Sequence, residues 1–407
     1  MSFFKRMNKK QWIGLVFATV IIFYDMLLYS IIIPLTSYYE TTFHASPTLI
    51  GILFSSYSVT LLLTTTYFGQ LTDRIGRKKP IIIGLIGMTV STILFAHPLN
   101  FEMLIIARAL QGIASAATWT AALALIADLF NEKERAIAMG FAITSMSAGT
   151  LLGAPIGGFL VEFGGYQAPF YTTSLLLLVT MVLGIFYLKD EERPVIQETS
   201  VKTWDLLRQR EVLWILAIMV IAEGALTMLE PVLPMYLTEV FDANTIFVGL
   251  MFGAMTLAYG IMAPVSGALI NKYHPSRVVL TGLLLSGVTL PFVVLAQSTI
   301  QLVAALFILG GSISLAVSPT LTMLGNSQSS SNQSSYGTLY SLFNIFFAVA
   351  AIIGPFFGGV LTDVFTSKIT IIIASGGILL GTLGLWLSSK KVYLQRHRVK
   401  SSEANIP

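Results

Sequence analysis

A single carboxylate, Asp25, stands about halfway along the apolar run 12–37, and this residue type could bind a cation or a proton. The run is long enough to cross a bilayer, which needs about 20 apolar residues. An acid near the membrane centre costs about 2.5–3.5 kcal/mol on insertion scales, so it is rare unless it faces a cavity or a partner. Asp25 is therefore predicted to be a site for protons, a cation, or both in turn. The alternative is a buried polar anchor that joins two helices.

Two further acids, Glu223 and Glu230, stand seven residues apart in the apolar run 212–238, a spacing that places them on one helical face. Arg108 is the one base that lies away from the ends of the predicted membrane runs. Three acids against one base predict a negative cavity. Burial favours a neutral carboxyl group and a nearby cation favours a charged one, so a proton and a cationic substrate can compete for one acid. Two alternatives stay open: Glu230 could be solvated near the outer interface, and Arg108 could serve only a structural ion pair.

The composition of the chain indicates that membrane-spanning helices position these residues. The chain has 407 residues, of which 55% are hydrophobic and 11% charged, whereas a soluble domain carries about 25% charged residues. It contains no cysteine, which excludes disulfides, thiolate metal sites and a cysteine nucleophile. We predict an all-α polytopic membrane protein with twelve transmembrane helices. They are expected at about 12–37, 47–71, 80–98, 101–128, 135–162, 167–188, 212–238, 246–271, 277–296, 299–325, 334–363 and 368–389.

Basic residues mark one side of the predicted membrane. With twelve crossings, both termini and the segments 72–79, 132–135, 189–211 and 272–277 face the same side. These segments hold all of the 24 Lys and Arg residues except Arg108 and Lys368. The positive-inside rule therefore predicts that this side is cytoplasmic. We expect a multi-pass protein of the cell (plasma) membrane with both termini in the cytoplasm.

The polar segment 189–211 divides the chain into two halves that repeat weakly. A shift of 198 residues sets Glu223 opposite Asp25. Two six-helix halves related by an axis along the membrane normal are a transporter architecture, with substrate bound between them near the midplane. The same shift aligns Phe43 with Phe241, Gly51 with Gly249 and Gly69 with Gly267. The expected domains are an N-terminal six-helix bundle at 1–188, a cytoplasmic linker at 189–211, a C-terminal six-helix bundle at 212–389 and a cytoplasmic tail at 390–407.

The loop after the second helix reads Gly-Gln-Leu-Thr-Asp-Arg-Ile-Gly-Arg-Lys-Lys-Pro from Gly69 to Pro80. It resembles the G-x-L-x-D-R-x-G-R-K signature of the major facilitator superfamily, at the place where that family carries it. The resemblance implies a part in conformational change: Gly69 would allow close helix packing, and Asp73 with the basic cluster would hold an outward-open state. The alternative is an ordinary basic cytoplasmic loop. The matching residues are Gly69, Asp73, Arg74, Gly76, Arg77 and Lys78.

Two further motifs resemble those of proton-coupled members. Arg108 and Gly112 match an R-x-x-x-G motif of the fourth helix. The fifth helix is similar to the antiporter motif, which ends G-P-x-x-G-G, although Ala154 intervenes before Pro155 here. The resemblance implies export; plain packing of small residues is the alternative. The fifth-helix residues concerned are Gly140, Gly149, Gly153, Pro155, Gly157 and Gly158.

The chain looks most like vesicular monoamine transporters and their bacterial multidrug-exporting relatives. This resemblance rests on Asp25-Met-Leu-Leu with Pro34, on the Arg108 motif, on Met228-Leu-Glu-Pro-Val-Leu-Pro and on Tyr336-Gly through Gly354-Pro. It implies that the first-helix acid contacts the substrate amine, while the seventh-helix Glu and the fourth-helix Arg join a polar network. Three positions depart from the family. Tyr57 stands where a lysine is expected, Asn344 stands for the acid of the eleventh helix, and the acid of the tenth helix has no counterpart.

The predicted function is a proton-coupled antiporter for aromatic or lipophilic organic cations, including drugs and monoamines. Candidate residues for substrate binding and proton coupling are Asp25, Glu223, Glu230, Arg108, Asn344 and Tyr340. The alternatives are a proton-coupled uptake symporter of a polar nutrient and a non-transporting membrane sensor of the same fold. No catalytic motif or phosphate-binding Gly-Lys-Ser/Thr loop is found, so we expect neither an enzyme nor a cofactor or metal. The expected partners are the organic cation, protons and the lipid bilayer, without nucleic acid, in a monomer.

Overall fold

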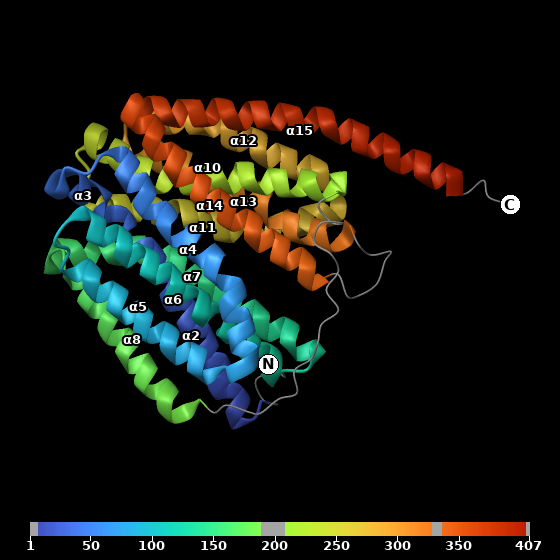
Figure 1. Cartoon of the computed structure of the whole chain (residues 1–407). Coiled ribbons are helices and arrows are strands. Elements are labelled where there is room, and N and C mark those ends of the chain that lie inside the picture. Colours follow the sequence, from blue (N-terminus) through green and yellow to red (C-terminus); the bar gives the residue numbers. More distant parts are fainter. Residues whose placement is uncertain (1–6, 189–207, 328–335, 404–407) are drawn as a thin grey trace. The chain divides into compact units, whose positions relative to one another are not determined.

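The computed structural model describes residues 7–188, 208–327 and 336–403, and every regular element within these ranges is a helix (Figure 1). Twelve helical spans in the described chain are long and apolar enough to cross a membrane, which confirms the predicted all-α polytopic fold. The elements are α2 (Lys9–Ile31), η1 (Ile33–Leu35), α3 (Thr36–Phe43), α4 (Pro47–Ile75), α5 (Lys78–Ala96), α6 (Phe101–Leu129), α7 (Glu132–Gly164), α8 (Ala168–Tyr187), α10 (Arg210–Phe241), α11 (Thr245–Lys272), α12 (Pro275–Leu295), α13 (Thr299–Ser327), α14 (Tyr336–Val364) and α15 (Ser367–Glu403).

Polar side chains fix where several helices begin. Asn8 and Gln11 form a reciprocal capping box at the start of α2, with hydrogen bonds of 2.8 and 3.0 Å. Asn100 and Asn131 cap α6 and α7, each accepting a bond of 3.0 Å from the third backbone amide of the helix. These caps satisfy amide groups that have no partner inside the helix.

Pro34 interrupts the first predicted span. The α-helix ends at Ile31, Pro34 lies in the short 3-10 turn η1, and the chain resumes helical geometry in α3. Proline has no amide hydrogen to donate and its ring clashes with the preceding turn, so the helix breaks there. Asp25 therefore lies in the regular part of α2, before the break.

The chain forms two compact units. Unit 1 comprises Met1–Gln197, Glu230–Gly253 and Pro355–Asp363, and unit 2 comprises Glu198–Leu229, Ala254–Gly354 and Val364–Pro407. The division runs through α10, α11 and α14, so parts of these helices belong to each unit. Most of the predicted linker 189–211 lies outside the described residues, and the division of the chain into two six-helix halves stays a prediction.

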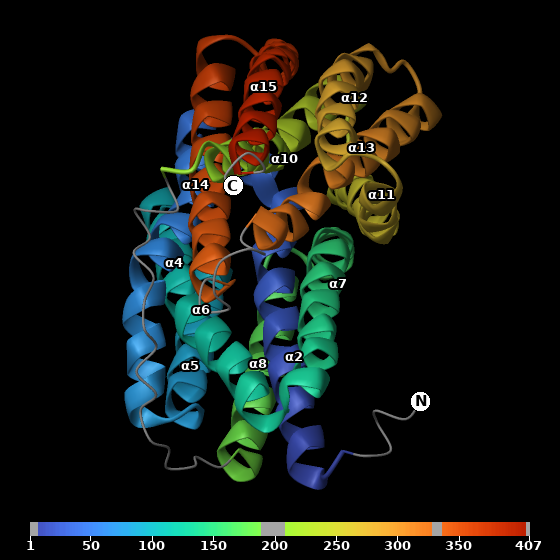
Figure 2. The ribbon, with the colours of Figure 1, turned by 90° about the vertical axis from the view of Figure 1, so that its right-hand side faces the viewer.

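Within unit 1, α2 packs closely against α7 (Figure 2). A Cβ atom at Gly153 would lie 2.7 Å from the carbonyl oxygen of Leu27, and one at Gly157 would lie 2.5 Å from that of Ile31. At Gly149 a Cβ would overlap the carbonyl oxygen of Phe23. Glycine is needed at all three positions because α7 presses against the backbone of α2 on both sides of Asp25.

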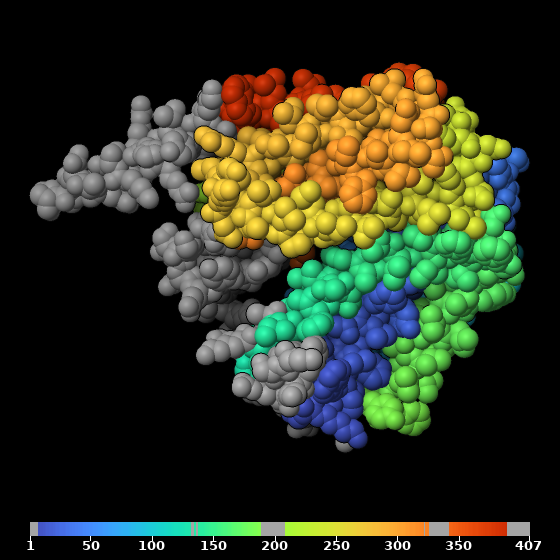
Figure 3. All heavy atoms as spheres, turned by 180° about the vertical axis from the view of Figure 1, so that it is seen from behind, coloured from blue at the N-terminus to red at the C-terminus, as the bar shows by residue number. Residues whose placement is uncertain are grey.

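Within unit 2, α12 packs against α13 and α15. Ser375 donates a hydrogen bond of 2.6 Å to the carbonyl oxygen of Gly287, and the indole of Trp214 donates one of 3.0 Å to that of Leu385. In the view from behind, α11, α12 and α13 cover the surface of this unit (Figure 3). Large apolar side chains of α12 and α13, such as Phe292 and Ile308, are exposed, as expected of helices that face lipid.

Candidate functional site

Asp25 is buried where α2, α4 and α6 meet, with 1% of its surface exposed. Ser115 of α6 donates a hydrogen bond to Oδ2 of Asp25 at 2.6 Å, and the Tyr57 hydroxyl of α4 lies 3.2 Å from Oδ1. The two hydroxyl groups are themselves 2.8 Å apart. Hydrogen bonds to a carboxylate are charge-assisted and favour its ionised form. The site can therefore hold a negative charge in a place shielded from water.

Arg108 is completely buried on α6, close to the same group. Its Nη1 donates to Gln111 at 2.6 Å and its Nη2 donates to the carbonyl oxygen of Tyr29 at 3.1 Å. The guanidinium carbon lies 4.8 Å from the ring centre of Tyr29 and 4.9 Å from that of Tyr57, a cation–π geometry. In the described ranges, no carboxylate lies within ion-pair distance of Arg108 and its Nε has no hydrogen-bond partner. Its charge therefore acts on the nearby acids through space.

Glu230 belongs to the same unit as Asp25 and is also buried. The Tyr29 hydroxyl donates a hydrogen bond to Oε2 of Glu230 at 2.8 Å. The rings of Tyr29 and Tyr57 meet edge to face, with centres 5.1 Å apart. Two tyrosines, one bonded to each acid, thus join Asp25 to Glu230, and Arg108 lies against the rings of both. The alternative that Glu230 is merely solvated does not fit its burial.

The glycine of the R-x-x-x-G motif helps to build this group. A Cβ at Gly112 would overlap the carbonyl oxygen of Tyr57 and the Thr60 hydroxyl, so glycine lets α6 approach α4 at the turn that carries Tyr57. Thr60 also donates to the Ala109 carbonyl at 2.8 Å across the same contact. Arg108, Gly112 and Ser115 therefore act along one face of α6.

Three members of the group were not singled out from the sequence as site residues. Tyr57 was noted only as a departure from the family, whereas Ser115 and Gln111 were not considered. Their spacing offers a signal, because Gln111 and Ser115 follow Arg108 by three and seven residues and so share its helical face. Tyr29 likewise follows Asp25 by one helical turn.

Glu223 lies in unit 2, on α10, with 5% of its surface exposed. Among the described residues, Tyr259 of α11 is the side chain that interacts electrostatically with it, and no hydroxyl, amide or cationic group binds its carboxyl group. The other two candidates lie on α14. Asn344 is exposed, and the side chain of Tyr340 lies outside the described residues.

In the loop motif Gly69–Pro80, Arg77 makes contacts with both α4 and α6. Its Nε donates to Asp128 of α6 at 3.0 Å, and its Nη1 donates to Asp73 at 2.7 Å and to the Thr72 carbonyl at 2.8 Å. Burial opposes the charge of Arg77, but its hydrogen bonds to the two carboxylates outweigh burial and raise its pKa above the usual value. Gly76 ends α4 with φ of 87°, which other residues rarely adopt.

Other motif residues behave differently. Arg74 is exposed. A Cβ at Gly69 or at Gly140 would meet no atom of the described residues within 4 Å, so the close packing expected at Gly69 is not made in this structure. Gly158, by contrast, packs against the carbonyl oxygen of Thr245 within unit 1. Among the glycines of the loop motif and of α7, those that make the close contacts described here are therefore Gly149, Gly153, Gly157 and Gly158.

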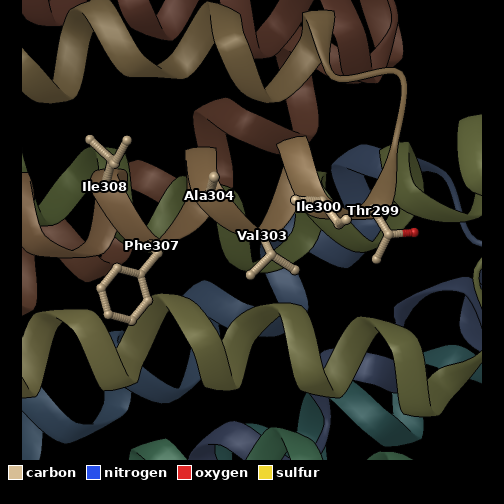
Figure 4. Close-up of a pocket in the computed structure, with 6 residues that line it drawn as sticks. All are labelled: Thr299, Ile300, Val303, Ala304, Phe307 and Ile308. Carbon is tan, nitrogen blue, oxygen red and sulfur yellow. The ribbon is translucent and has the colours of Figure 1, made fainter.

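A hollow of about 460 Å³ lies beside α13 in unit 2 (Figure 4). The side chains around it carry no charge, and Thr299 supplies the polar group. A cation would find no acid there, and an apolar hollow on such a surface suits lipid chains. The lining residues are Thr299, Ile300, Val303, Ala304, Phe307 and Ile308.

Comparison with known proteins agrees with this architecture. The model of the Major Facilitator Superfamily matches residues 15–242 and 215–404. The chain is 30% identical over 311 residues to the synaptic vesicular amine transporter of Bos taurus, covering 76% of this chain and 60% of that protein. It is 30% identical over 356 residues to the chromaffin granule amine transporter of Rattus norvegicus, covering 87% and 68%. The vesicular acetylcholine transporter of Drosophila melanogaster is 28% identical over 324 residues, covering 78% and 56%.

The matched part of the chain thus spans 60% of the synaptic vesicular amine transporter and 68% of the chromaffin granule amine transporter. Among solved structures, a bacterial homologue of the human lysosomal transporter Spinster, in an inward-facing and unoccupied conformation, superposes with a TM-score of 0.83 at 13% identity. The match covers 94% of this chain and 98% of that one and concerns the fold. This multi-pass membrane protein belongs to the major facilitator superfamily, a family of transporters and not of enzymes.

Proposed function

We propose that this protein exchanges protons for an aromatic or lipophilic organic cation, such as a drug or a monoamine, by alternating access. The observation that carries the proposal is the buried group around Asp25. A carboxylate supplied with two hydroxyl donors, next to the faces of two tyrosines, suits an ammonium group attached to an apolar body. The similarity to transporters named for amines and for acetylcholine supports a cationic substrate.

In this proposal Asp25 binds the positive nitrogen of the substrate. An entering cation takes the place of the Tyr57 hydroxyl, which lies at a long distance of 3.2 Å, while the shorter bond from Ser115 keeps the carboxylate in position. Glu230 and Arg108 hold opposite charges nearby, and Tyr29 links Glu230 to the site. Glu223, Asn344 and Tyr340, which belong to unit 2, are proposed to take part in substrate binding or proton coupling.

The change between states would use the two motifs of unit 1. Arg77 holds the ends of α4 and α6 together through Asp73 and Asp128, with Gly69, Arg74 and Gly76 in the same loop. Small residues on α7 allow neighbouring helices to approach its backbone closely, and in this proposal those helices shift along α7 between states. The residues concerned are Gly149, Gly153, Pro155, Gly157 and Gly158. We place the protein in the cell membrane with both termini in the cytoplasm, because nearly all of its basic residues fall on that side.

The test is transport by purified protein in liposomes with an acidic interior. A panel of aromatic amines, quaternary cations and polar nutrients is added outside, and collapse of the pH gradient and accumulation of labelled substrate are both recorded. Exchange predicts that cations enter as protons leave. Movement of substrate and protons in the same direction would establish a symporter, and no movement of any compound would leave a sensor.

A matched pair of variants connects the result to the site. Asp25→Asn removes the buried charge, whereas Asp242→Asn changes an exposed acid at the end of α10. Asp242 has φ of 50°, a conformation that asparagine also adopts. The first variant is expected to lose transport and the second to retain it.

A further inference from the structure

We infer that the exchanged proton is carried by Glu223 in unit 2, apart from the carboxylate of Asp25 that binds the cation. This inference rests on the proposed function and assigns separate tasks to acids that the sequence alone leaves equivalent. It follows from the surroundings of the three buried carboxyl groups, because the same chemical group serves different purposes when its neighbours differ.

Asp25 and Glu230 are both supplied with donors. Asp25 receives hydrogen bonds from Ser115 and Tyr57, and Glu230 receives one from Tyr29. Both also lie in the field of Arg108, which acts electrostatically on each. These contacts favour the ionised carboxylate and offset part of the cost of its burial, so both acids are better suited to hold a charge than a buried acid without donors.

Glu223 has the opposite surroundings. The hydroxyl of Thr227, one turn away, donates to the carbonyl oxygens of Glu223 at 2.9 Å and of Ala350 at 3.3 Å. The Tyr259 hydroxyl interacts with Ser318. These two hydroxyl groups of α10 and α11 are thus bonded to other partners than the Glu223 carboxyl group.

Helix α14 packs against the turn of α10 that carries Glu223. A Cβ at Gly354 would overlap the carbonyl oxygen of Gly224 and the Thr227 hydroxyl, so the two backbones touch beside Glu223. In the described ranges no charged side chain of α10, α11, α13 or α14 acts on Glu223, and Tyr259 is the titratable group that faces it. A carboxyl group buried without a donor or a cation is held as the neutral acid, because its ionised form would be unsolvated.

The charges fit one cycle. With a proton on Glu223 and no substrate, the buried charges are those of Asp25, Glu230 and Arg108. When a monovalent cation binds Asp25 and Glu223 releases its proton to water, one positive charge has replaced another and the buried net charge is the same. A state without the cation and without the proton on Glu223 carries one more negative charge. A state with both the cation and that proton carries one fewer. Exchange requires that cation binding expels the proton, so that the two singly loaded states, which carry equal buried net charge, are the ones that cross between conformations.

The first experiment measures binding and proton release together, with tetraphenylphosphonium as the probe. This cation has no dissociable proton, so any proton released comes from the protein. In weakly buffered detergent solution, the unaltered protein is expected to release about one proton for each probe bound. Glu223→Gln is expected to bind the probe more weakly than the unaltered protein, because glutamine mimics the protonated acid, but more tightly than Asp25→Asn does, and to release no proton. Asp25→Asn is expected to lose at least tenfold in affinity.

The second experiment separates exchange from coupling in liposomes. Glu223→Gln should still exchange labelled for unlabelled tetraphenylphosphonium, which needs no proton, and should fail to accumulate the probe against a pH gradient. Glu102→Gln, at the exposed start of α6, is the matched control and should do both. Proton release or gradient-driven uptake by folded Glu223→Gln would overturn the inference, as would a loss of binding equal to that of Asp25→Asn.

A measurement on the unaltered protein does not depend on the folding of a variant. Dicyclohexylcarbodiimide adds to protonated carboxyl groups in apolar surroundings, so near neutral pH it should label the peptide that carries Glu223, and the label should diminish in the presence of tetraphenylphosphonium. Label on the Asp25 peptide instead would reverse the assignment. If the unaltered protein moves no cation against a pH gradient, the proposed function fails. If it does so and Glu223→Gln does as well, the division of tasks fails alone.

Discussion

The hydroxyl of Tyr29 donates a hydrogen bond to Oε2 of Glu230 across 2.8 Å, although 201 residues separate the two in the chain. Both residues belong to unit 1, where the ring of Tyr29 also lies against Arg108 and Tyr57. One side chain therefore touches the positive charge of Arg108, the tyrosine that binds Asp25 and the acid of α10.

Replacing Tyr29 by phenylalanine should remove the bond and keep the ring. Hydrogen bonds to charged groups contribute about 1.5–3 kcal/mol, so we expect the free energy of unfolding to fall by that order. Thermal unfolding in detergent measures the change. Tyr67→Phe, on an exposed part of α4, is the control and should alter stability by less than about 0.5 kcal/mol. Equal stability of the two variants would show that the bond contributes nothing.

Asp25→Asn should abolish transport while the protein still folds. Asparagine can keep a contact with Ser115 or Tyr57 but has no charge to offer a cation, and it removes a buried carboxylate that is costly to hold. Accumulation of an aromatic amine by inverted vesicles tests this, with elution on size exclusion as the check of folding. Unchanged accumulation by the folded variant removes Asp25 from the mechanism.

Glu230→Gln should impair transport less than Asp25→Asn does. The amide oxygen of glutamine can still accept the bond from Tyr29, and Asp25 keeps its own donors. We expect reduced but measurable accumulation in the same vesicles. A complete loss equal to that of Asp25→Asn would mean that Glu230, rather than Asp25, makes the decisive contact with the cation.

Gly153→Ala should destabilise the packing of α7 on α2. The new methyl group would lie 2.7 Å from the carbonyl oxygen of Leu27, so one backbone must move, at a cost of about 1–3 kcal/mol. Because Asp25 is one turn from this contact, cation binding should weaken as well. Gly140→Ala on the same helix meets no described atom within 4 Å and should change neither thermal stability nor affinity. Equal behaviour of the two variants would contradict the role given to α7.

Arg77→Gln should lower stability by about 1 kcal/mol, a modest amount because the side chain is 21% exposed. It breaks the contacts with Asp73 and Asp128 that join α4 to α6. The loss should shrink at high salt, where exposed ion pairs are screened. Lys79→Gln removes the same charge from an exposed position of the same loop and is the control. Thermal unfolding of the two variants is compared at low and high salt. Identical unfolding curves would show that the contacts of Arg77 do not stabilise the protein.

The amino-acid sequence alone determined the number of helices, their approximate limits and the membership of the superfamily. Apolar length, basic loops and the motif at Gly69–Pro80 are local properties, and each can be recognised without knowing what a helix touches. The burial of Asp25 and Glu223 is expected for the same reason, because an acid in the middle of a long apolar run has little chance of reaching water, whereas the sequence leaves open whether Glu230 is buried or solvated.

The partners of those acids were decided only by the tertiary structure. Hydropathy does not fix how far a helix is rotated or how closely it crosses its neighbour, so nothing in the sequence says that Ser115 faces Asp25 or that Tyr29 reaches Glu230. The same limit explains why Gly69 and Gly153 look equivalent in the chain, whereas of the two only Gly153 packs against another backbone among the described residues. Asp25 and Glu223 differ in their donors because Ser115 and Tyr57, which bind Asp25, come from helices distant in sequence, and only tertiary packing decides where such helices place a hydroxyl group.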